Sequence, residues 1–301
     1  MENLLSVKDL SKQQILDLLA LAKAVKANPA DYSQALAGKS IVTIYEKQSL
    51  RTRVSFDIGI HKLGGHAVYL DAQNGAIGER ETVKDFAANI SRWADAIVAR
   101  VMSHKTLEGL VEHGSVPVVN SLCDLYHPCQ ALADFLTISE HYEDVSKVKL
   151  AYVGEGNNVT HSLMLTGAIL GAEVTAVCPR GSSPDAQIVK QAMKLAEING
   201  GKINVTDNLD DIVDYDVIYG DTWVSMGDDT PLEQVKEKYM PYQINKELLI
   251  RTGIKHVLHC QPAHRELEIT SQVMDGEQSL IFDQAENRMH AQNAVLLTLL
   301  K

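Results

Sequence analysis

The features that this sequence lacks already limit what the protein can do. No apolar run approaches the roughly 18 residues that span a bilayer, and the first residues lack the basic stretch and apolar core of a secretory signal. The four cysteines, Cys123, Cys129, Cys178 and Cys260, form no CxxC pattern. We therefore expect a cytoplasmic protein with reduced thiols and no membrane partner.

Positive charge is also scarce. The chain has 28 Lys and Arg residues against 39 Asp and Glu residues, which gives a net charge of −11. An acidic surface repels phosphate backbones, so this charge balance argues against nucleic acid as a partner. An anionic substrate would need a local basic pocket that opposes the global charge.

What the sequence does contain is typical of a globular protein. Its 301 residues are 45% hydrophobic and 22% charged, and this length suggests about two domains. Short apolar, β-branched segments alternate with segments of helical periodicity. We expect strands at 40–45, 66–70, 96–99, 116–119, 149–153, 173–178, 202–205, 216–219 and 256–258. A first helix is expected after a capping-box pattern at Ser11 and Gln14, and Asn28-Pro29 ends it. We expect further helices at 52–63, 82–93, 105–113, 129–142, 159–170, 185–198 and 284–300.

This alternation predicts an α/β protein with two domains, each a parallel sheet flanked by helices. The helix predicted at 129–142 is long enough to connect them, and a second alternation of strands and helices begins at 149. We place the first domain at 1–140, together with the last helix at about 284–301, and the second at 141–283.

Segment 49–53 (SLRTR) follows a predicted strand and opens a helix. Free backbone N–H groups, hydroxyls and guanidiniums at a helix start suit a phosphate or a similar oxyanion. The alternative is an N-cap serine followed by two solvated arginines. Arginine is rare in this chain, and this favours the anion site.

His127 stands at another predicted helix entrance, with Pro128 at the first helical position. A histidine there can donate to a carbonyl oxygen, and Gln130 lies on the same helix face. The alternative is that His127 only caps the helix.

Segment 154–159 (GEGNNV) partly matches the dinucleotide fingerprint G-x-G-x-x-G/A but has valine at the third small position. The next predicted strand is followed by Arg180 and by no acidic residue. An NADP oxidoreductase stays possible, but we favour a tight turn that displays Asn157 and Asn158.

Two later loops also follow predicted strands. In 221–227 (DTWVSMG), Asp221 could bind an ammonium group and Ser225 a carboxylate; the alternative is a surface loop with a buried Trp223. In 259–265 (HCQPAHR), the spacing is wrong for zinc. Cys260 is either a hydrogen-bonding group in a cleft or a buried structural thiol.

The chain resembles the aspartate/ornithine carbamoyltransferase family through five segments that stand in the family's order: SLRTRVSFDIG, HPCQALAD, DTWVSMG, HCQPAHR and ENRMHAQ. The last three are similar to the ornithine branch. The resemblance covers nearly the whole chain. It implies transfer of a carbamoyl group from carbamoyl phosphate to the δ-amine of ornithine, which gives citrulline and phosphate in arginine biosynthesis. It also implies a homotrimer or a multiple of trimers, and no metal or other cofactor.

The resemblance assigns the first domain to carbamoyl phosphate and the second to ornithine. For carbamoyl phosphate it implies Ser49, Leu50, Arg51, Thr52, Arg100, His127, Gln130, Cys260, Gln261 and Arg288. For ornithine it implies Asn158, Asp221, Ser225 and Met226. The catalytic set is Arg100, His127, Asp221, Cys260 and Arg288.

Three positions depart from the family's pattern. Leu50 replaces a usual threonine, Gln261 a usual leucine, and Ala76 a glutamine that reaches a neighbouring subunit. Loss of a hydroxyl donor to phosphate costs about 1.5–3 kcal/mol, so we expect weakened binding of carbamoyl phosphate. The alternatives are another amine acceptor, such as an acylated ornithine or putrescine, and an inactive carbamoyl-phosphate-binding paralogue.

Overall fold

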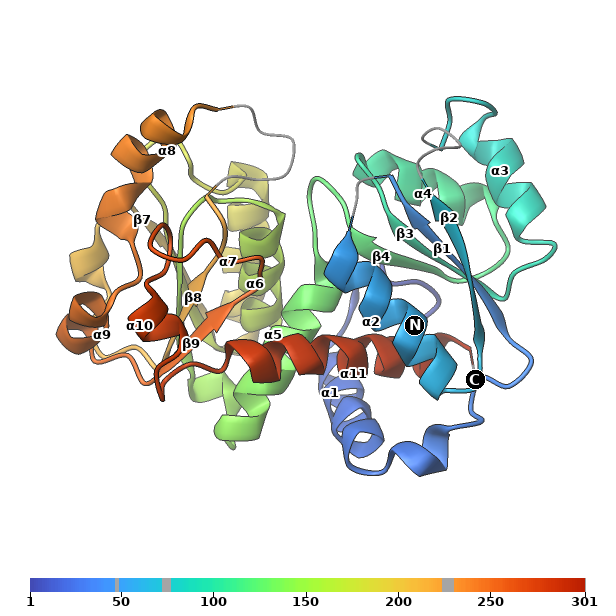
Figure 1. The fold of residues 1–301 in the computed structure, drawn as a ribbon, viewed down its shortest axis with the longest axis horizontal. Coiled ribbons are helices and arrows are strands. Elements are labelled where there is room, and N and C mark those ends of the chain that lie inside the picture. Colours follow the sequence, from blue (N-terminus) through green and yellow to red (C-terminus); the bar gives the residue numbers. More distant parts are fainter. Residues whose placement is uncertain (47–48, 72–76, 224–229, 301) are drawn as a thin grey trace. The chain divides into compact units, whose positions relative to one another are not determined.

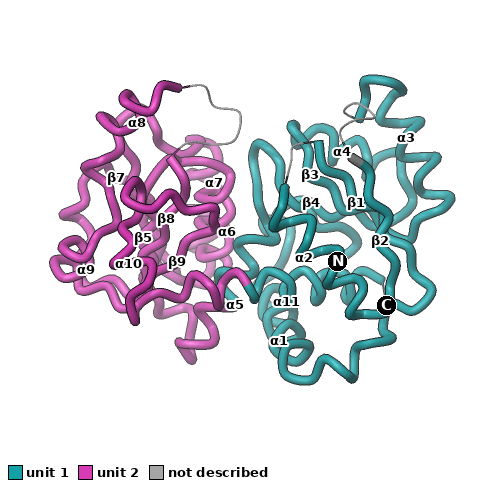
Figure 2. Tube along the Cα trace, in the orientation of Figure 1, with its two compact units in different colours: residues 1–136, 286–301 teal, residues 137–285 magenta. Residues whose placement is uncertain are grey.

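The computed structural model of the chain describes residues 1–46, 49–71, 77–223 and 230–300. The chain divides into two compact units (Figure 2): unit 1 comprises Met1–Leu136 and Glu286–Lys301, and unit 2 comprises Thr137–Ala285. Each unit contains one parallel β-sheet with helices around it (Figure 1). The predicted α/β architecture with two parallel sheets is confirmed.

Unit 1 is built on a four-stranded sheet with the order β2-β1-β3-β4. Its strands are β1 (Ser40–Tyr45), β2 (His66–Asp71), β3 (Ala96–Arg100) and β4 (Val118–Leu122). Its helices are α1 (Lys12–Ala27), α2 (Leu50–Lys62), α3 (Val83–Ile90), α4 (His104–His113), most of α5 (Pro128–His141) and most of α11 (Ile281–Leu299). The first helix starts at the capping box that the sequence predicts, since Gln14 N donates to Ser11 Oγ and Ser11 N donates to Gln14 Oε1.

Unit 2 is built on a five-stranded sheet with the order β7-β6-β5-β8-β9. Its strands are β5 (Lys149–Val153), β6 (Glu173–Val177), β7 (Lys202–Thr206), β8 (Val217–Gly220) and β9 (His256–His259). Its helices include α6 (Asn158–Leu170), α7 (Ala186–Asn199), α8 (Leu232–Tyr239), α9 (Lys246–Thr252) and α10 (Ser271–Met274). All but one residue of α6 is buried, including the polar residues Thr160, His161, Ser162 and Thr166.

Each sheet has one point at which the strand order reverses direction. In unit 1 it lies between β1 and β3, where Tyr45 pairs with Arg100. In unit 2 it lies between β5 and β8, where Val153 pairs with Gly220. Chains that leave two neighbouring parallel strands in opposite directions open a crevice at the carboxyl ends, where ligands bind in such sheets.

The structure also corrects several predicted boundaries. The strand predicted at 116–119 starts at Val118, directly after Pro117, because proline cannot donate to a ladder. The helix predicted from 52 begins at Leu50, so the SLRTR segment lies in its first turn. The short helices α8, α9 and α10 were missed, because the apolar face of a short helix gives a weak periodic signal. In the described part of the chain, no helix is long and apolar enough to cross a membrane.

Candidate functional site

The start of α2 forms an anion cradle in unit 1. Ser49 is the N-cap residue, with extended backbone angles and no capping bond from its own side chain, and its hydroxyl accepts a hydrogen bond from Arg100 Nη1 at 3.2 Å. Arg288 Nη2 donates to Thr52 Oγ1 at 2.9 Å. The N–H groups in the first turn of a helix have no partner within the helix. Two guanidiniums and a helix N-terminus therefore converge on one turn, and this is a suitable site for an oxyanion.

The electrostatics of this cradle favour a negative ligand. Burial and then the charge of Arg288 lower the pKa of Arg100 to about 10, while nearby Tyr45 opposes the shift. Burial, followed by the charges of Arg288 and Arg100, holds the pKa of His127 well below its usual value. Its imidazole is therefore neutral at pH 7. An anion between the two guanidiniums would relieve their mutual repulsion.

His127 and Gln130 lie at the start of α5, where both side chains are buried. The His127 carbonyl accepts hydrogen bonds from Gln130 N and Ala131 N, so the backbone of His127 caps the helix. Gln130 Nε2 donates to Asp134 Oδ1 at 2.8 Å. Within the described residues, Gln130 Oε1 and Arg100 Nε are buried without a hydrogen-bond partner. These two groups are open to a ligand.

The two arginines of SLRTR differ from each other. The Arg53 guanidinium lies 3.6 Å from the centre of the Tyr69 ring, and its Nε is 3.6 Å from Asp57 Oδ2. The charge of Arg53 therefore interacts with Tyr69 and Asp57 on the surface of unit 1. Arg51 is exposed, and Leu50 is 75% exposed, so neither side chain supports the core.

In unit 2, the carboxylate of Asp221 is the centre of a second cluster. Asp221 directly follows β8 and is 6% exposed. Its Oδ1 accepts hydrogen bonds from Cys260 Sγ at 2.8 Å and from Thr222 N at 2.7 Å. Its Oδ2 accepts one from Asn157 Nδ2 at 2.8 Å. A buried carboxylate beside a thiol is suited to bind and orient a substrate amine.

The residue that holds Asp221 is Asn157, whereas the resemblance singled out its neighbour Asn158. Asn157 is the N-cap of α6, and its Oδ1 accepts from Val159 N and Thr160 N. Its amide nitrogen is thus left to reach Asp221. The capping box of Asn157 and Thr160 was the available sequence signal for this position.

The turn at Gly154 and Gly156 has no space for a dinucleotide. A Cβ atom on Gly156 would lie 2.1 Å from Pro184 N, because segment 182–184 covers the turn. Gly156 N donates to Ser182 O, and Arg180 is paired with Asp207. A pyrophosphate cannot approach the backbone here, and the dinucleotide alternative is wrong.

The remaining sequence predictions have varied outcomes. Cys260 contacts Asp221 in unit 2, and Trp223 is buried and stacks on Tyr239. Ser225, Met226 and Ala76 lie outside the described residues. Among the residues that the structure describes, no cluster of three His, Cys, Asp or Glu side chains could hold a metal ion.

Known proteins match both units. The carbamoyl-P binding domain of aspartate/ornithine carbamoyltransferases matches residues 2–140, and the Asp/Orn binding domain of the same family matches residues 146–299. The ornithine carbamoyltransferase of Moritella profunda is 97% identical over all 301 residues of both chains. That of Shewanella oneidensis is 62% identical over 99% of each chain.

Solved structures have the same fold. Ornithine carbamoyltransferase from Pyrococcus furiosus aligns with a TM-score of 0.94 at 43% identity, covering 98% of this chain and 96% of its own. An acetylornithine transcarbamylase complexed with acetylcitrulline aligns with a TM-score of 0.90 at 26% identity, and the alignment covers both chains completely.

Proposed function

Because the chain belongs to the aspartate/ornithine carbamoyltransferase family, we propose that it transfers the carbamoyl group of carbamoyl phosphate to the δ-amine of L-ornithine. The products are L-citrulline and phosphate. The observation that carries this proposal is the opposite chemistry of the two clusters. Unit 1 gathers guanidiniums at a helix start, and unit 2 presents the buried carboxylate of Asp221, which accepts hydrogen bonds from its neighbours.

Carbamoyl phosphate binds to the cradle of unit 1 in this proposal. Its phosphate lies on the first turn of α2, against Ser49, Arg51, Thr52 and the backbone N–H of Leu50. Its carbonyl oxygen accepts hydrogen bonds from the remaining donors. Those donors are Arg100, His127, Gln130 and Arg288, with Cys260 and Gln261 at the carbamoyl end.

Ornithine binds to unit 2 through Asn158, Asp221, Ser225 and Met226. Asp221 and Cys260 orient its amines. Free ornithine carries mostly protonated amines at pH 7, so the enzyme binds or creates the neutral δ-amine form. Asp221 and Ser225 suit a free α-ammonium and a free α-carboxylate, and this disfavours acylated ornithine and putrescine as acceptors.

In the transfer step, the δ-amine attacks the carbamoyl carbon and negative charge develops on the carbonyl oxygen. Prearranged donors at such an oxygen stabilise the transition state by roughly 3–4 kcal/mol each in favourable cases. Phosphate leaves with its electron pair on an oxygen that the arginines stabilise. A bond forms between the δ-nitrogen and the carbamoyl carbon while the bond from that carbon to the phosphate oxygen breaks. The proton that the nitrogen loses passes to the departing phosphate, so that neutral citrulline urea and hydrogen phosphate result, with no change of oxidation state.

The cellular setting is part of the proposal. We place the activity in arginine biosynthesis and in the cytoplasm, where the four free thiols stay reduced. A homotrimer is part of this proposal, and association of copies is supported by two apolar side chains one turn apart on α2, Val54 and Ile58, which are each 44% exposed. Exposed apolar surface of this kind marks association sites, and sedimentation velocity measures the assembly directly.

The first experiment is a citrulline assay with purified protein, in which carbamoyl phosphate is varied over a wide range. Putrescine and N-acetylornithine are tested in parallel as acceptors. We expect citrulline from ornithine and no carbamoylated product from the other two. Turnover of another amine alone, or of none, contradicts the proposed function.

A further inference from the structure

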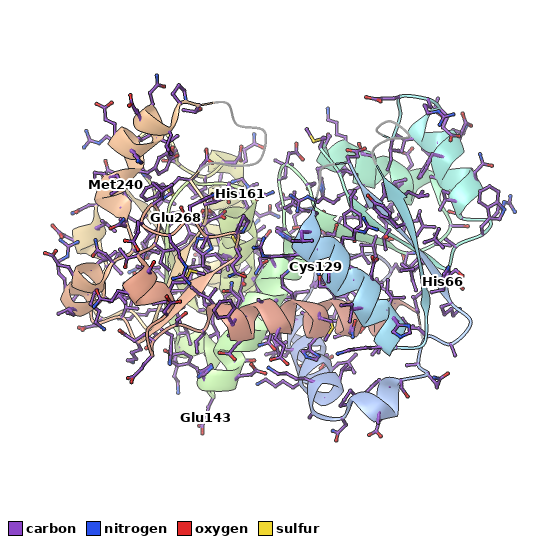
Figure 3. All side chains as sticks on the ribbon, viewed as in Figure 1. His66, Cys129, Glu143, His161, Met240 and Glu268 are labelled. Carbon is purple, nitrogen blue, oxygen red and sulfur yellow. The ribbon has the colours of Figure 1, made fainter. Side chains whose placement is uncertain are left out.

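Glu268 is a buried carboxylate that none of the roles above uses. Its side chain is 2% exposed, and Figure 3 labels it within unit 2. Its backbone oxygen accepts a hydrogen bond from Ile244 N at 2.8 Å, and the next residue, Ile269, is fully buried in the core of this unit. The backbone of Glu268 is therefore anchored, and its side chain starts from a fixed position.

The carboxylate contacts the segment that carries Cys260. Its Oε1 accepts a hydrogen bond from His264 N, lies 3.4 Å from His259 Nε2 and lies 3.7 Å from His264 Nδ1. His259 and His264 flank the Cys260–Pro262 turn on both sides. One oxygen of Glu268 thus meets the start and the end of the same loop.

The hydrogen bonds of His259 determine its tautomer. Nδ1 accepts from Gln261 N at 2.9 Å, so the proton of the ring lies on Nε2, the nitrogen nearest to Glu268. The side chain of His259 has no exposed surface. Glu268 Oε1 lies 3.4 Å from His259 Nε2, and although the geometry makes no hydrogen bond, the contact restricts the orientation of the buried imidazole ring.

His259 contacts the chain neighbours of both Asp221 and Cys260. It pairs with Gly220 across β8 and β9, and a Cβ atom on Gly220 would lie 3.1 Å from His259 Cδ2. The ring therefore lies against the residue that precedes Asp221. Through its Nδ1 it also holds the residue that follows Cys260.

The loop needs such support because of its backbone. Gln261 has a φ of +56°, in the left-handed region that non-glycine residues rarely adopt. Residues in this region persist when their surroundings hold them there. The hydrogen bond from Gln261 N to His259 Nδ1 holds Gln261 in this conformation.

We propose that Glu268 is a positioning residue of the amine-binding cluster. By holding His259 and His264 it fixes the Cys260 loop, and it thereby keeps the Cys260 thiol donating to Asp221. The proposal rests on the proposed function for its link to ornithine, while its claim about the loop stands on the contacts of unit 2 alone.

The kinetic test compares Glu268→Ala, Glu268→Asp and Glu268→Gln with Glu237→Gln, an exposed control on α8. At metal sites, removing the outer partner of a ligating side chain costs about 10- to 100-fold in activity, and we take the same range for Glu268. We expect Glu268→Ala to raise KM for ornithine to that extent without a change in KM for carbamoyl phosphate. Glu268→Asp shortens the side chain by one methylene. We expect it to raise KM for ornithine by a smaller factor, again without a change in KM for carbamoyl phosphate. Glu268→Gln keeps an oxygen acceptor and restores most of the loss.

The second readout is the rate at which iodoacetamide alkylates Cys260, followed by peptide mass spectrometry. Cys260 is partly exposed, whereas Cys123, Cys129 and Cys178 are buried. We expect faster alkylation in Glu268→Ala, and the wild-type rate in Glu268→Gln and in the control. This measurement needs no turnover, so it separates the loop claim from the proposed function.

Two outcomes overturn the proposal. One is a Glu268→Ala variant with wild-type KM for ornithine and a wild-type alkylation rate. The other is an equal loss for both substrates together with a lower Tm in all three variants, which shows a purely structural role. If the wild-type chain makes no citrulline, the proposed function fails, and the alkylation rates then support or overturn the loop claim.

Discussion

The carboxyl ends of the two sheets share a topology but differ in chemistry. In unit 1, the reversal point between β1 and β3 presents the guanidinium of Arg100, and the neutral imidazole of His127 follows the next strand, β4. In unit 2, the reversal point between β5 and β8 presents a buried carboxylate with a thiol and an amide bound to it. Strand order thus fixes where each ligand binds, while the side chains there decide its charge.

The two sites also differ in how they are supported. The unit 1 cradle depends on the N–H groups of α2, which any helix start provides. The unit 2 cluster depends on a loop with left-handed backbone at Gln261 and on buried partners around it. Side-chain changes in the unit 1 cradle should therefore affect ligand binding directly. Changes at the buried partners of the Cys260 loop in unit 2 should affect binding by moving that loop.

The largest expected effect comes from removing a cation in unit 1. In the proposed mechanism, Arg288→Ala deletes a donor to the developing oxyanion, and loss of one such donor lowers kcat by about 10²–10³. The matched control is Arg53→Ala, because Arg53 lies on Tyr69 at the surface. Steady-state kinetics should show a large loss in the first variant and a nearly unchanged kcat in the second. Equal losses would contradict the distinction between the two arginines.

The corresponding change in unit 2 is Asp221→Asn, which keeps the shape and removes the charge. Loss of a charged hydrogen bond costs about 1.5–3 kcal/mol, or roughly 10- to 150-fold. We expect this loss in kcat/KM for ornithine, with KM for carbamoyl phosphate unchanged. Asp211→Asn is a control on the same unit, since Asp211 is exposed. A rise in KM for carbamoyl phosphate alone would reverse the assignment of the two sites.

A gain of affinity is expected at Leu50. Leu50→Thr adds a hydroxyl at the first residue of α2, where the side chain is exposed and nothing in the core is disturbed. We expect KM for carbamoyl phosphate to fall by about tenfold, the lower end for a hydrogen bond to a charged group. Leu50→Val, which adds no donor, is the control. An unchanged or higher KM in the threonine variant would remove this explanation.

The smallest effect concerns stability and pH. The pKa of His127 is held well below its unfolded value by burial and by Arg288 and Arg100. The unfolded chain therefore binds more protons near and below its unfolded pKa of about 6.5. The free energy of unfolding is highest above that pH and falls as the pH drops below it, by at most about 1.4 kcal/mol per pH unit for this group.

Urea unfolding at pH 7 and pH 5 measures this dependence. His127→Gln should reduce the difference between the two pH values, and His61→Gln, which changes an exposed histidine, should leave it unchanged. A wild-type pH dependence in His127→Gln would show that other groups account for it.

Much of the fold and part of the sites followed from the sequence. Alternating strand and helix periods predicted both sheets, and the Ser11–Gln14 capping box predicted the start of α1, because these signals are local. The same local logic placed Ser49 at a helix start and Asp221 past a strand. It did not distinguish Asn157 from Asn158, since both stand at one turn and only the orientation of the side chains separates them.

The sequence by itself determined the alternation of elements and the polar segments at their ends, because periodicity and capping act over a few residues. Only the tertiary structure decided which of those residues meet. Arg288 reaches Thr52 across 236 positions, segment 182–184 closes the glycine turn, and Glu268 holds the Cys260 loop from behind. Such contacts depend on how elements far apart in the chain pack together, and no local pattern encodes that packing.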